Sequence, residues 1–537
     1  MKLFRTLFWG VLGTAVLFTL LLSSLFARET AVAAPYTTPI TTITVNSGTD
    51  PDTSDSRTCI TYTPCTLRRA VIQARNLPAN EKPVLIAFDI PATVEEGYNS
   101  TLQIWKIQFS GISSAANATL RYLNGSIIID GSTQPGGRSD GPRIILVGPG
   151  TGQWDGLKLG ETSAQNANEI RGLGFQLFKT HIYVNSSSNI IAGNWFGLSD
   201  DGTDIVLRGG GEDDGSGNTG VSVAENSTNN AIENNVFTGL AGVAAAVNGD
   251  NGTFSNNYVG TIANGTVPGK LTDPSLICSQ WDWLGGSGIS ISGDGNTIED
   301  NIFAGLRIAV EPPTIQADTI RVGSDYQIIR NNKIGLDAAN TEIGVCGRGI
   351  YLMGGTEFNQ ITTNQIIRPG LSAISLNDTP VVSTSDANTL RGNVIKKLTP
   401  WGEIEGNNSP EDAIQMTKSL PDAFRNFKPA QVTNIDGTTV NGSSGTGSPC
   451  PNCIVELFLD DSDAITETLQ SLAVVTANAS GNWTAVLPAE LAPGQGLRTT
   501  STTTQHNTIP GMSLGTTTGL SVLYLPGYQI YIPVIKK

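Results

Sequence analysis

The chain has 537 residues, of which 15% are charged and 7% aromatic, and it contains 61 glycines. This composition is typical of a protein built from turns and short strands, and it argues against a mainly helical fold. The formal net charge of −15 argues against nucleic acid and anionic membrane surfaces as partners, because both would be repelled.

The first 34 residues have the organisation of a secretory signal peptide. Lys2 and Arg5 precede an apolar run from Leu7 to Phe26, and the small residues AVAA follow at 31–34. We therefore predict a secreted or cell-surface protein whose mature chain does not span the membrane. Because the apolar run is 20 residues long, an uncleaved N-terminal anchor is the alternative.

Residues 36–120 are predicted to form an N-terminal cap region. Within it the segment PCTLRRAVIQAR, 64–75, predicts a helix with Thr63 as N-cap and Pro64 at the first helical position. Such a helix covers an open strand edge, which would otherwise pair with other chains. One face of the helix is apolar and carries Leu67, Ala70, Val71 and Ala74.

From residue 121 to residue 427 the chain repeats a loose phrase, N-x-I-x-x-N-x-[IFV], at intervals of 21 to 44 residues. A short strand with alternating apolar residues precedes most copies, for example GLKL at 156–159 and GISI at 288–291. A unit of two or three short strands without a helix cannot bury its apolar face alone, whereas stacked units can. The repeats therefore predict a solenoid of stacked coils.

The second asparagine of the phrase keeps one register through its copies. At a corner of a coil, stacked asparagine side chains can hydrogen-bond to one another and to the turn backbone at the strand spacing of about 4.8 Å. We interpret this file as a structural ladder and not as a ligand site, because a buried turn needs these hydrogen bonds. Its members are Asn194, Asn235, Asn257, Asn301, Asn332, Asn364 and Asn393.

These repeats resemble the right-handed parallel β-helix repeats of secreted bacterial proteins, and the segment ahead of them resembles the N-terminal region named for its CSLREA motif. Here the motif stands as CTLRRA, Cys65 to Ala70, after TITVNSGTDPD and before LIAFDI and SIIIDGSTQPG. The resemblance covers about residues 41–420 and implies an all-β fold, a right-handed parallel β-helix of the pectin lyase-like kind. The sequence departs from the motif at Arg69, where the family usually has glutamate.

Residues 428–523 change character and predict a separate small domain. Short strands such as IVELFLD and LAVVTANASGNWTAVL are separated by turns, which is typical of an antiparallel β-sandwich. The pattern up to ANASGNW resembles the immunoglobulin-like modules appended to bacterial surface proteins. The C-terminal tail, 524–537, is too short to span a bilayer, and it is interpreted as a final strand, with a sorting signal as the alternative.

In an exported protein the six cysteines are expected to form structural disulfides. Short loops bring Cys59 next to Cys65 and Cys450 next to Cys453, and insertions from the same corner carry Cys278 and Cys346. We therefore predict three disulfides. A redox role for the CPNC sequence is disfavoured because a strand and not a helix follows it, and a four-cysteine zinc site is the alternative.

Insertions follow the same corner in three coils, at 198–218, 261–287 and 336–348, and we call the side from which they project the insertion side. Carboxylates among glycine and serine can ligate Ca²⁺, and exposed tryptophans can stack on sugar rings. Acidic loops that are merely solvated are the alternative. The candidate metal ligands are Asp200, Asp201, Glu212, Asp213 and Asp214, and the candidate glycan-binding residues are Trp281 and Trp283.

The sequence favours binding over catalysis. Hydrolases of the resembled fold use motifs similar to NTD, DD, GHG and RIK, of which only DD is present, and the two histidines are His181 and His506. No catalytic residue is assigned. We predict a non-catalytic protein for adhesion or for binding an extracellular polysaccharide or cell-surface glycan, with Ca²⁺ as the candidate cofactor. A Ca²⁺-dependent polysaccharide lyase or a glycoside hydrolase is the alternative.

Overall fold

The fold is taken from a computed structural model of the chain. The chain divides into two compact units, 1–40 and 41–537, and the fold is that of the second unit. The predicted signal peptide lies outside the described residues. Within the part of the chain that the structure describes, no helix has the length and apolar character needed to cross a membrane. The described residues are 38–50, 56–109, 120–150, 152–162, 167–208, 218–267, 286–307, 318–376, 387–396, 413–416, 427–444, 450–463, 465–504 and 513–526.

Sheet 1 has 11 strands, which pair in the order in which they occur along the chain. Each pair is parallel and in register, so that Ile191 lies opposite Ile232 and Ile232 lies opposite Phe254. The strands are β1 (Thr41–Val45), β2 (Val84–Phe88), β5 (Ile127–Asp130), β8 (Glu169–Arg171), β11 (Ile190–Ala192), β14 (Ala231–Glu233), β17 (Thr253–Ser255), β20 (Thr297–Glu299), β23 (Ile328–Arg330), β26 (Gln360–Thr362) and β29 (Thr389–Arg391).

Sheet 2 has nine strands and is also parallel. Its strands precede those of sheet 1 in each coil, and most of them were predicted from their alternating apolar residues. They are β7 (Asp155–Leu159), β10 (Thr180–Val184), β13 (Thr219–Val223), β16 (Val243–Val247), β19 (Ser287–Ile291), β22 (Ile320–Val322), β25 (Ile350–Leu352), β28 (Ile374–Leu376) and β31 (Ile414–Met416).

Sheet 3 has 11 strands and follows sheet 1 in each coil. Its first pair, β3 with β4, is antiparallel and the others are parallel. The strands are β3 (Tyr98–Asn99), β4 (Ile104–Gln108), β6 (Ile144–Val147), β9 (Leu173–Gln176), β12 (Trp195–Phe196), β15 (Val236–Phe237), β18 (Tyr258–Val259), β21 (Ile302–Phe303), β24 (Lys333–Ile334), β27 (Gln365–Ile367) and β30 (Val394–Lys396).

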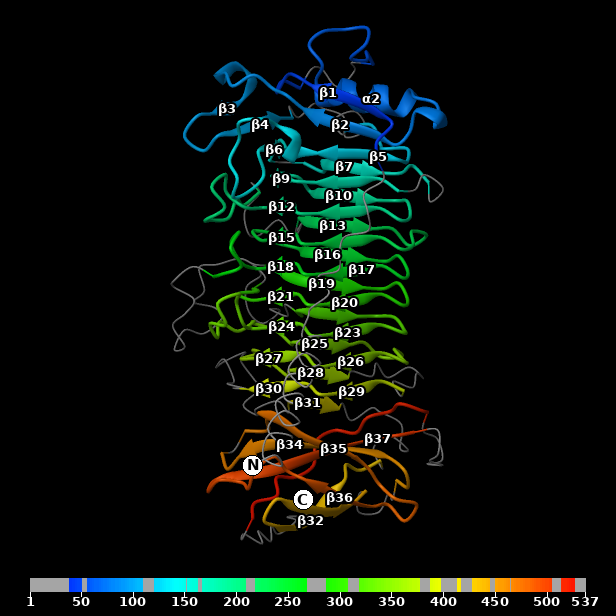
Figure 1. Ribbon diagram of the computed structural model, residues 1–537, viewed down its shortest axis with the longest axis vertical. Coiled ribbons are helices and arrows are strands. Elements are labelled where there is room, and N and C mark those ends of the chain that lie inside the picture. The colour runs from blue at the N-terminus through cyan, green and yellow to red at the C-terminus, as the bar shows by residue number, and fades with distance from the viewer. Residues whose placement is uncertain are drawn as a thin grey trace, which may run out of the picture. The chain divides into compact units, whose positions relative to one another are not determined.

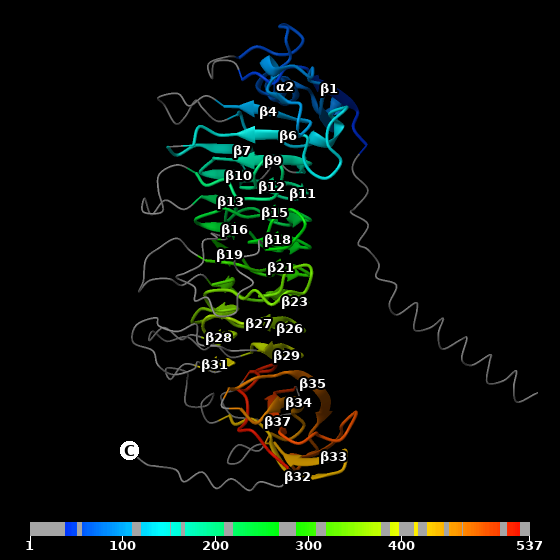
Figure 2. The same ribbon diagram turned by 90° about the vertical axis from the view of Figure 1, so that its left-hand side faces the viewer.

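The three sheets wind into a right-handed parallel β-helix, and the predicted fold class is confirmed. Figure 1 shows the strands stacked coil upon coil, and in Figure 2 the strands β10, β11 and β12 of one coil lie at the same level. Inward side chains fill the interior, where Phe175, Phe196 and Phe237 stack with ring centroids 5.1 and 4.6 Å apart. Because identical positions stack in register, each coil tolerates changes that keep its inward residues apolar.

The capping helix is present, but it begins later than predicted. Helix α2 runs from Leu67 to Asn76, and its N-cap is Thr66, whose side chain accepts a hydrogen bond from the Arg69 N–H. The prediction of Thr63 as N-cap was wrong. The reason is that Cys65 pairs with Asn46 beside β1 through the bonds Asn46 N–H to Cys65 O and Cys65 N–H to Asn46 Oδ1, which keeps this segment extended.

Strands from the predicted cap region belong to the parallel stack. Sheet 1 begins with β1 at Thr41 and continues through β2 into β5, so the ladder starts well ahead of residue 121. Short 3-10 helices interrupt the connections of this part of the chain. They are η1 (Ala79–Glu81), η2 (Val94–Glu96) and η3 (Gly131–Thr133).

Disulfides join Cys59 to Cys65 and Cys450 to Cys453. Cys346 is also disulfide-bonded, and its predicted partner, Cys278, lies outside the described residues. The first bridge closes the loop ahead of helix α2, and the second closes the turn before β34. The bridge between Cys278 and Cys346 stays a prediction.

The C-terminal domain consists of two antiparallel sheets, which agrees with the predicted sandwich. Trp483 and Val455 lie in its core. One sheet contains β32 (Gln431–Asp436), β33 (Thr439–Ser443) and β36 (Asn482–Val486), and the other contains β34 (Ile454–Asp461), β35 (Gln470–Thr476) and β37 (Gln495–Thr502).

This domain satisfies the hydrogen bonds at the open edge of the last coil. Ile395 and Thr468 form an antiparallel bridge, and the Thr468 hydroxyl accepts from the Ile395 N–H and donates to the Asn393 carbonyl. The Leu390 N–H donates to the Thr517 hydroxyl, and the Gly392 N–H donates to the Glu456 carboxylate. The C-terminal domain is therefore the cap of the solenoid, since an unpaired strand edge would recruit other chains.

Candidate functional site

The corner between sheet 1 and sheet 3, which we call the first corner, carries an uninterrupted file of asparagines. Each Nδ2 donates to the Oδ1 of the next asparagine, as from Asn235 to Asn257 and from Asn257 to Asn301, and the backbone N–H groups donate to the same oxygens. The file runs from Asn194 to Asn393 with these bonds at 2.9 to 3.1 Å. Its amides are committed to buried backbone groups, so the first corner is structural.

The corner between sheet 2 and sheet 1, which we call the second corner, carries another file that sequence reasoning missed. Asn189 Nδ2 donates to Asn230 Oδ1, and Asn359 Nδ2 donates to Asn388 Oδ1. The first asparagine of the repeated phrase marks this file in the sequence, but no role was predicted for it. The file consists of Asn168, Asn189, Asn230, Gly252, Asn296, Gln327, Asn359 and Asn388.

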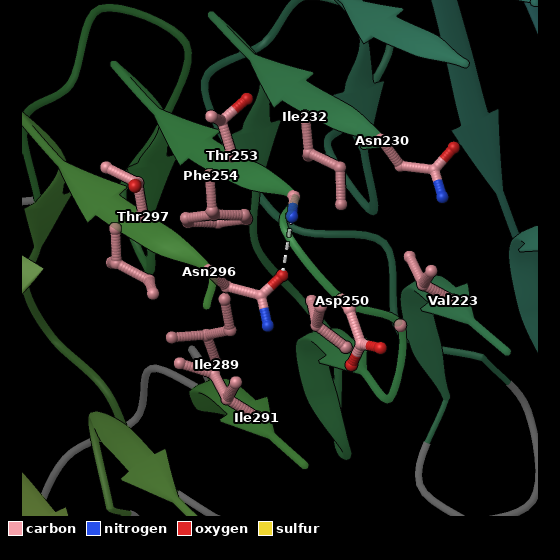
Figure 3. Close-up of a pocket in the computed structure, with 14 residues that line it drawn as sticks. Val223, Asn230, Ile232, Asp250, Thr253, Phe254, Ile289, Ile291, Asn296 and Thr297 are labelled. Atoms are coloured by element: carbon pink, nitrogen blue, oxygen red, sulfur yellow. Dashed lines mark hydrogen bonds between the residues drawn. The ribbon is translucent and has the colours of Figure 1, made fainter. Parts of the chain in front are cut away.

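Gly252 interrupts the second file and leaves a small cavity at that level, shown in Figure 3. Asn230 and Asn296 line it together with apolar residues of the interior, and the Gly252 N–H donates to Asn296 Oδ1 across it. The cavity measures about 10 Å³, which is the space of one water molecule. It is too small for a sugar or a cofactor, so we do not assign it as a ligand site.

The second corner carries a file of acidic side chains, each two residues before a ladder residue in the chain. The Asp250 carboxylate accepts from the Asp294 N–H, the Asp294 carboxylate from the Asp325 N–H, and the Asp325 carboxylate from the Glu357 N–H. These bonds measure 2.8 to 3.0 Å and hold each turn against the next. Within the described chain no ion pair reaches Asp250, Asp294 or Asp325.

Between the acids and the ladder residues, two coils place aromatic side chains on the surface. Tyr326 is 57% exposed and Phe358 is 40% exposed. Their rings are stacked with centroids 5.0 Å apart and an angle of 7° between the planes. We call Tyr326, Phe358 and the flanking Asp294, Asp325 and Glu357 the aromatic corner.

Both aromatic residues adopt the left-handed backbone conformation, with φ of 61° at Tyr326 and 58° at Phe358. The equivalent residues of other coils are asparagine, glycine or small residues: Asn229, Asn251, Gly295, Ala167, Ser188 and Ala387. This conformation costs a bulky residue about 1–2 kcal/mol. Stacking of the two rings stabilises the pair by about 0.5–1.5 kcal/mol, which is less than the cost of two left-handed residues. Stability of the turn therefore does not explain the aromatic side chains.

Tyr326 has one ring face against Phe358, and the preceding coil has glycine at the equivalent position. Gly295 therefore sets no side chain opposite the other face. The Asn251 carboxamide reaches to this level, because its Oδ1 lies 2.6 Å from the place that a Cβ on Gly295 would take. The aromatic corner thus combines an exposed ring with an amide and carboxylates on a rigid turn.

The insertion side is described only in part. Asp200 forms an ion pair with Lys106 at 2.7 Å, and its other carboxylate oxygen accepts from Gln176. The Asp201 carboxylate accepts from the Ser199 hydroxyl and the Thr203 N–H, and the first of these bonds is the main cause that lowers its pKa. The other predicted site residues, Glu212, Asp213, Asp214, Trp281 and Trp283, lie outside the described residues.

The described parts of the three insertions form one layer beside sheet 3, on the left in Figure 1. The Ala263 N–H donates to the Gly202 carbonyl, and the Ala338 N–H donates to the Gly265 carbonyl. The side chains of Asp201 and Asn264 each accept a hydrogen bond from the backbone N–H two residues later in the chain, which closes the turns. These polar side chains fold the loops, and Asp200 would have to give up Lys106 to ligate a cation.

One further group of acids is close enough to share an ion. It lies in the C-terminal domain and consists of Asp461, Asp463 and Glu467, and the residues that the structure describes contain no second group of this kind. The Asp461 and Asp463 carboxylates accept from the backbone N–H groups of Asp463 and Ile465. Because turn formation accounts for these aspartates, we assign no metal to the group.

His181 is buried inside the solenoid and not available to a substrate. Its Nδ1 lies 3.1 Å from the Thr219 carbonyl, and burial lowers its pKa to about 4. The rings of Phe175, Phe178 and Phe196 pack against it in T-shaped geometry. His506 lies outside the described residues.

Two glutamates on the outer side of sheet 1 have altered acidity. Burial raises the pKa of Glu233, and no hydrogen bond or ion pair to its carboxylate occurs within the described chain. Burial also raises the pKa of Glu169, whose carboxylate pairs with Arg171 at 2.5 Å. Glu169 is only 4% exposed, so Glu233 is the more accessible acid.

No family model matches this sequence, and no curated protein does. Several solved structures are similar to the chain. They include Geobacillus virus E2 ORF18, with 13% identity, a TM-score of 0.38 and coverage of 88% of this chain and 79% of that chain. The Dettilon tailspike protein gp208 has 12% identity, a TM-score of 0.32 and coverage of 89% and 93%. A mutant tailspike protein of E. coli bacteriophage HK620 in complex with pentasaccharide has 13% identity, a TM-score of 0.28 and coverage of 81% and 87%. All three TM-scores are below 0.5, so the arguments about function rest on this chain's own residues.

Proposed function

We propose that this chain is a secreted or cell-surface protein that binds extracellular glycans without cleaving them, and that the aromatic corner is a binding surface. The observation that carries the proposal is the exposed stack of Tyr326 and Phe358 in a left-handed turn. Residues in such conformations gather at functional sites, because the turn itself would be more stable with asparagine or glycine.

The chemistry of the aromatic corner suits a sugar. The apolar face of a pyranose ring packs on an aromatic ring, and its hydroxyl groups donate to carboxylates and amides. Tyr326 supplies the ring, and Asp325, Asp294 and Asn251 supply oxygen acceptors on the same turn and on the turns of the two preceding coils. The turn is held by inter-coil hydrogen bonds, so little conformational entropy is lost when a ligand binds.

The insertion side stays part of the proposal. Trp281 and Trp283 are proposed to contact the same or a second glycan, because loops on a rigid solenoid can carry contact residues without disturbing the core. Ca²⁺ is proposed to order the acidic loop, with Asp201, Glu212, Asp213 and Asp214 as its ligands and with Asp200 joining them only if it leaves Lys106.

The test replaces both aromatic residues by the residue that other coils use at this position. In the variant Tyr326→Asn with Phe358→Asn we expect glycan binding to fall at least tenfold, measured by calorimetry against a panel of oligosaccharides. We expect the thermal unfolding midpoint to stay the same or rise, because asparagine tolerates the left-handed conformation.

A matched control removes exposed apolar side chains elsewhere. The variant Val486→Ala with Val522→Ala changes two residues of the C-terminal domain that are 68% and 76% exposed. It should leave glycan binding unchanged. Equal binding by the control and by the Tyr326 and Phe358 variant would contradict the assignment of the aromatic corner.

A glycoside hydrolase is the second candidate function, and Glu233 is the observation that favours it. A half-buried carboxyl group with a raised pKa can act as a general acid, with a second carboxylate as its partner. Incubation of the chain with the same oligosaccharides should then release products, and Glu233→Gln should abolish their release. Binding without products in the native chain supports the binding protein.

A further inference from the structure

We propose that the aromatic corner selects an uncharged glycan and rejects the uronic-acid polymer of the same stereochemistry. This inference rests on the proposed glycan binding and specifies the class of ligand. It follows from the carboxylates that line the turn on which Tyr326 and Phe358 stand.

The acids form a file whose members are one coil apart. Asp294 and Asp325 are joined through the Asp325 N–H, and Asp325 and Glu357 are joined through the Glu357 N–H, each at 2.8 to 3.0 Å. Adjacent coils are separated by about 4.8 Å, so successive carboxylates lie at that interval. Asp325 directly precedes Tyr326, and Asp294 directly precedes Gly295, on the side of the ring away from Phe358.

Asp294 and Asp325 have no ion pair that compensates their negative charge within the described residues. Arg330 on the outer side of sheet 1 pairs with Glu299 at 2.7 Å, and Arg321 on sheet 2 donates to the Met353 sulfur. A ligand on Tyr326 therefore meets negative charge on the same turn and on the turn of the preceding coil.

The size of the effect follows from the spacing. A uronate carboxylate about 5 Å from one aspartate in water loses roughly fourfold in affinity, and two aspartates together lower the affinity about tenfold at ~0.01 M ionic strength, where the Debye length is about 30 Å. The hydroxymethyl group of the neutral sugar carries no charge and can instead donate a hydrogen bond to the same carboxylates. The aromatic ring contacts the sugar in the same way whether it carries a carboxylate or a hydroxymethyl group. The acidic side chains therefore determine which of the two ligands binds more tightly.

The experiment uses ligands that differ only in this charge. Oligogalacturonides and their carboxyl-reduced counterparts, with mannuronan and glucuronan oligomers treated in the same way, are titrated into the full chain in EDTA at ~0.01 M ionic strength. We expect each reduced oligomer that binds to do so about tenfold more tightly than its acidic form, with a preference that shrinks as salt is added. Equal or tighter binding of the acidic forms would overturn the inference.

The variant Asp294→Asn with Asp325→Asn removes the charges and keeps the Oδ1 acceptors that hold the turns. We expect it to bind the acidic oligomers about tenfold more tightly than the native chain does, and the reduced oligomers within about twofold of the native value. Asp250→Asn is the matched control, since it makes the same kind of bond two coils before Tyr326 and should retain most of the selectivity.

The outcomes separate the inference from the proposed function. If no oligomer binds, or if the Tyr326 and Phe358 variant binds as well as the native chain, the proposed binding surface fails. If oligomers bind through the aromatic residues but the acidic forms are preferred, only the charge selectivity fails.

Discussion

The two corners that flank sheet 1 use the same hydrogen bonds, but only the first is uniform. From Asn194 to Asn393 the first corner has asparagine in every coil, and the left-handed residue ahead of it is small or polar, as at Gly193 and Thr363. The second corner has Gly252 and Gln327 within its file, and it places Tyr326 in the left-handed position. The same backbone geometry therefore admits two very different sets of side chains.

The difference separates positions that hold the fold from positions that are available for contact. The amides of the first corner are buried and bonded to backbone, so a change there costs stability. At the second corner the ladder residues are also buried, but the side chains just ahead of them reach solvent, as Tyr326 and Phe358 do. Function is proposed at the second corner because there the chain departs from what the turn prefers.

The largest expected effect breaks the uniform corner. In Asn257→Ala the Asn235 N–H and one hydrogen of the Asn235 amide lose their acceptor inside the solenoid, and the Ile232 carbonyl loses a donor. The Asn235 amide keeps its bond to the Ile191 carbonyl. We expect a loss of about 3–5 kcal/mol in the free energy of unfolding, because each buried unpaired group costs about 1–3 kcal/mol. Urea unfolding followed by circular dichroism measures it.

The control for this prediction lies at the second corner. Asn248→Ala removes an exposed asparagine, and we expect a change within about 0.5 kcal/mol. Similar losses in Asn257→Ala and Asn248→Ala would mean that the file of the first corner adds no stability beyond that of a surface amide.

The repeats made the coil predictable, because packing and ladder bonds constrain the same positions in each turn of the solenoid. Ile191, Ile232 and Phe254 occur at one register of the phrase, and they stack in the interior. Asn189 and Asn230 occupy the first position of the same phrase and form a file of their own, but a single asparagine before a strand is also typical of any turn. The sequence pattern alone therefore did not distinguish a ladder asparagine from an asparagine of an ordinary turn.

Contacts between distant segments were not predictable from the pattern. Thr468 and Glu456 bind the last coil from a domain that follows it, and neither a threonine nor a glutamate in the sequence indicates its partner. The aromatic corner was missed for another reason. Tyr326 and Phe358 stand next to ladder residues, where an aromatic side chain is expected to be buried, and only the left-handed backbone turns them to the surface.

The end of the first corner provides a pH-dependent test. Glu456 accepts from the Gly392 N–H, and burial raises the pKa of Glu456 above its usual range. The folded protein therefore takes up a proton at a higher pH than the unfolded chain does. Stability relative to Glu456→Gln, which cannot titrate, should rise as the pH falls from 7 through the raised pKa.

Urea midpoints of the native chain and of Glu456→Gln at pH 7, 5.5 and 4 check this sign. Glu490→Gln, at an exposed glutamate of the same domain, is the control for the loss of a surface carboxylate. A difference between the native chain and Glu456→Gln that moves in favour of the variant on acidification would contradict the assigned burial effect.

The smallest expected effect sharpens the comparison at the second corner itself. Tyr326→Asn relieves a left-handed aromatic residue, which gains about 1 kcal/mol, and loses the stack with Phe358, which costs about the same. The single variant should therefore be nearly neutral. Phe358→Asn in that background has no stack left to lose, so it should stabilise the chain by about 1 kcal/mol. The two single variants and the double variant form a cycle whose coupling, about 0.5–1.5 kcal/mol, measures the stack. If either single variant instead lost more than about 1 kcal/mol, the aromatic pair would be there for stability, and the second corner would be structural like the first.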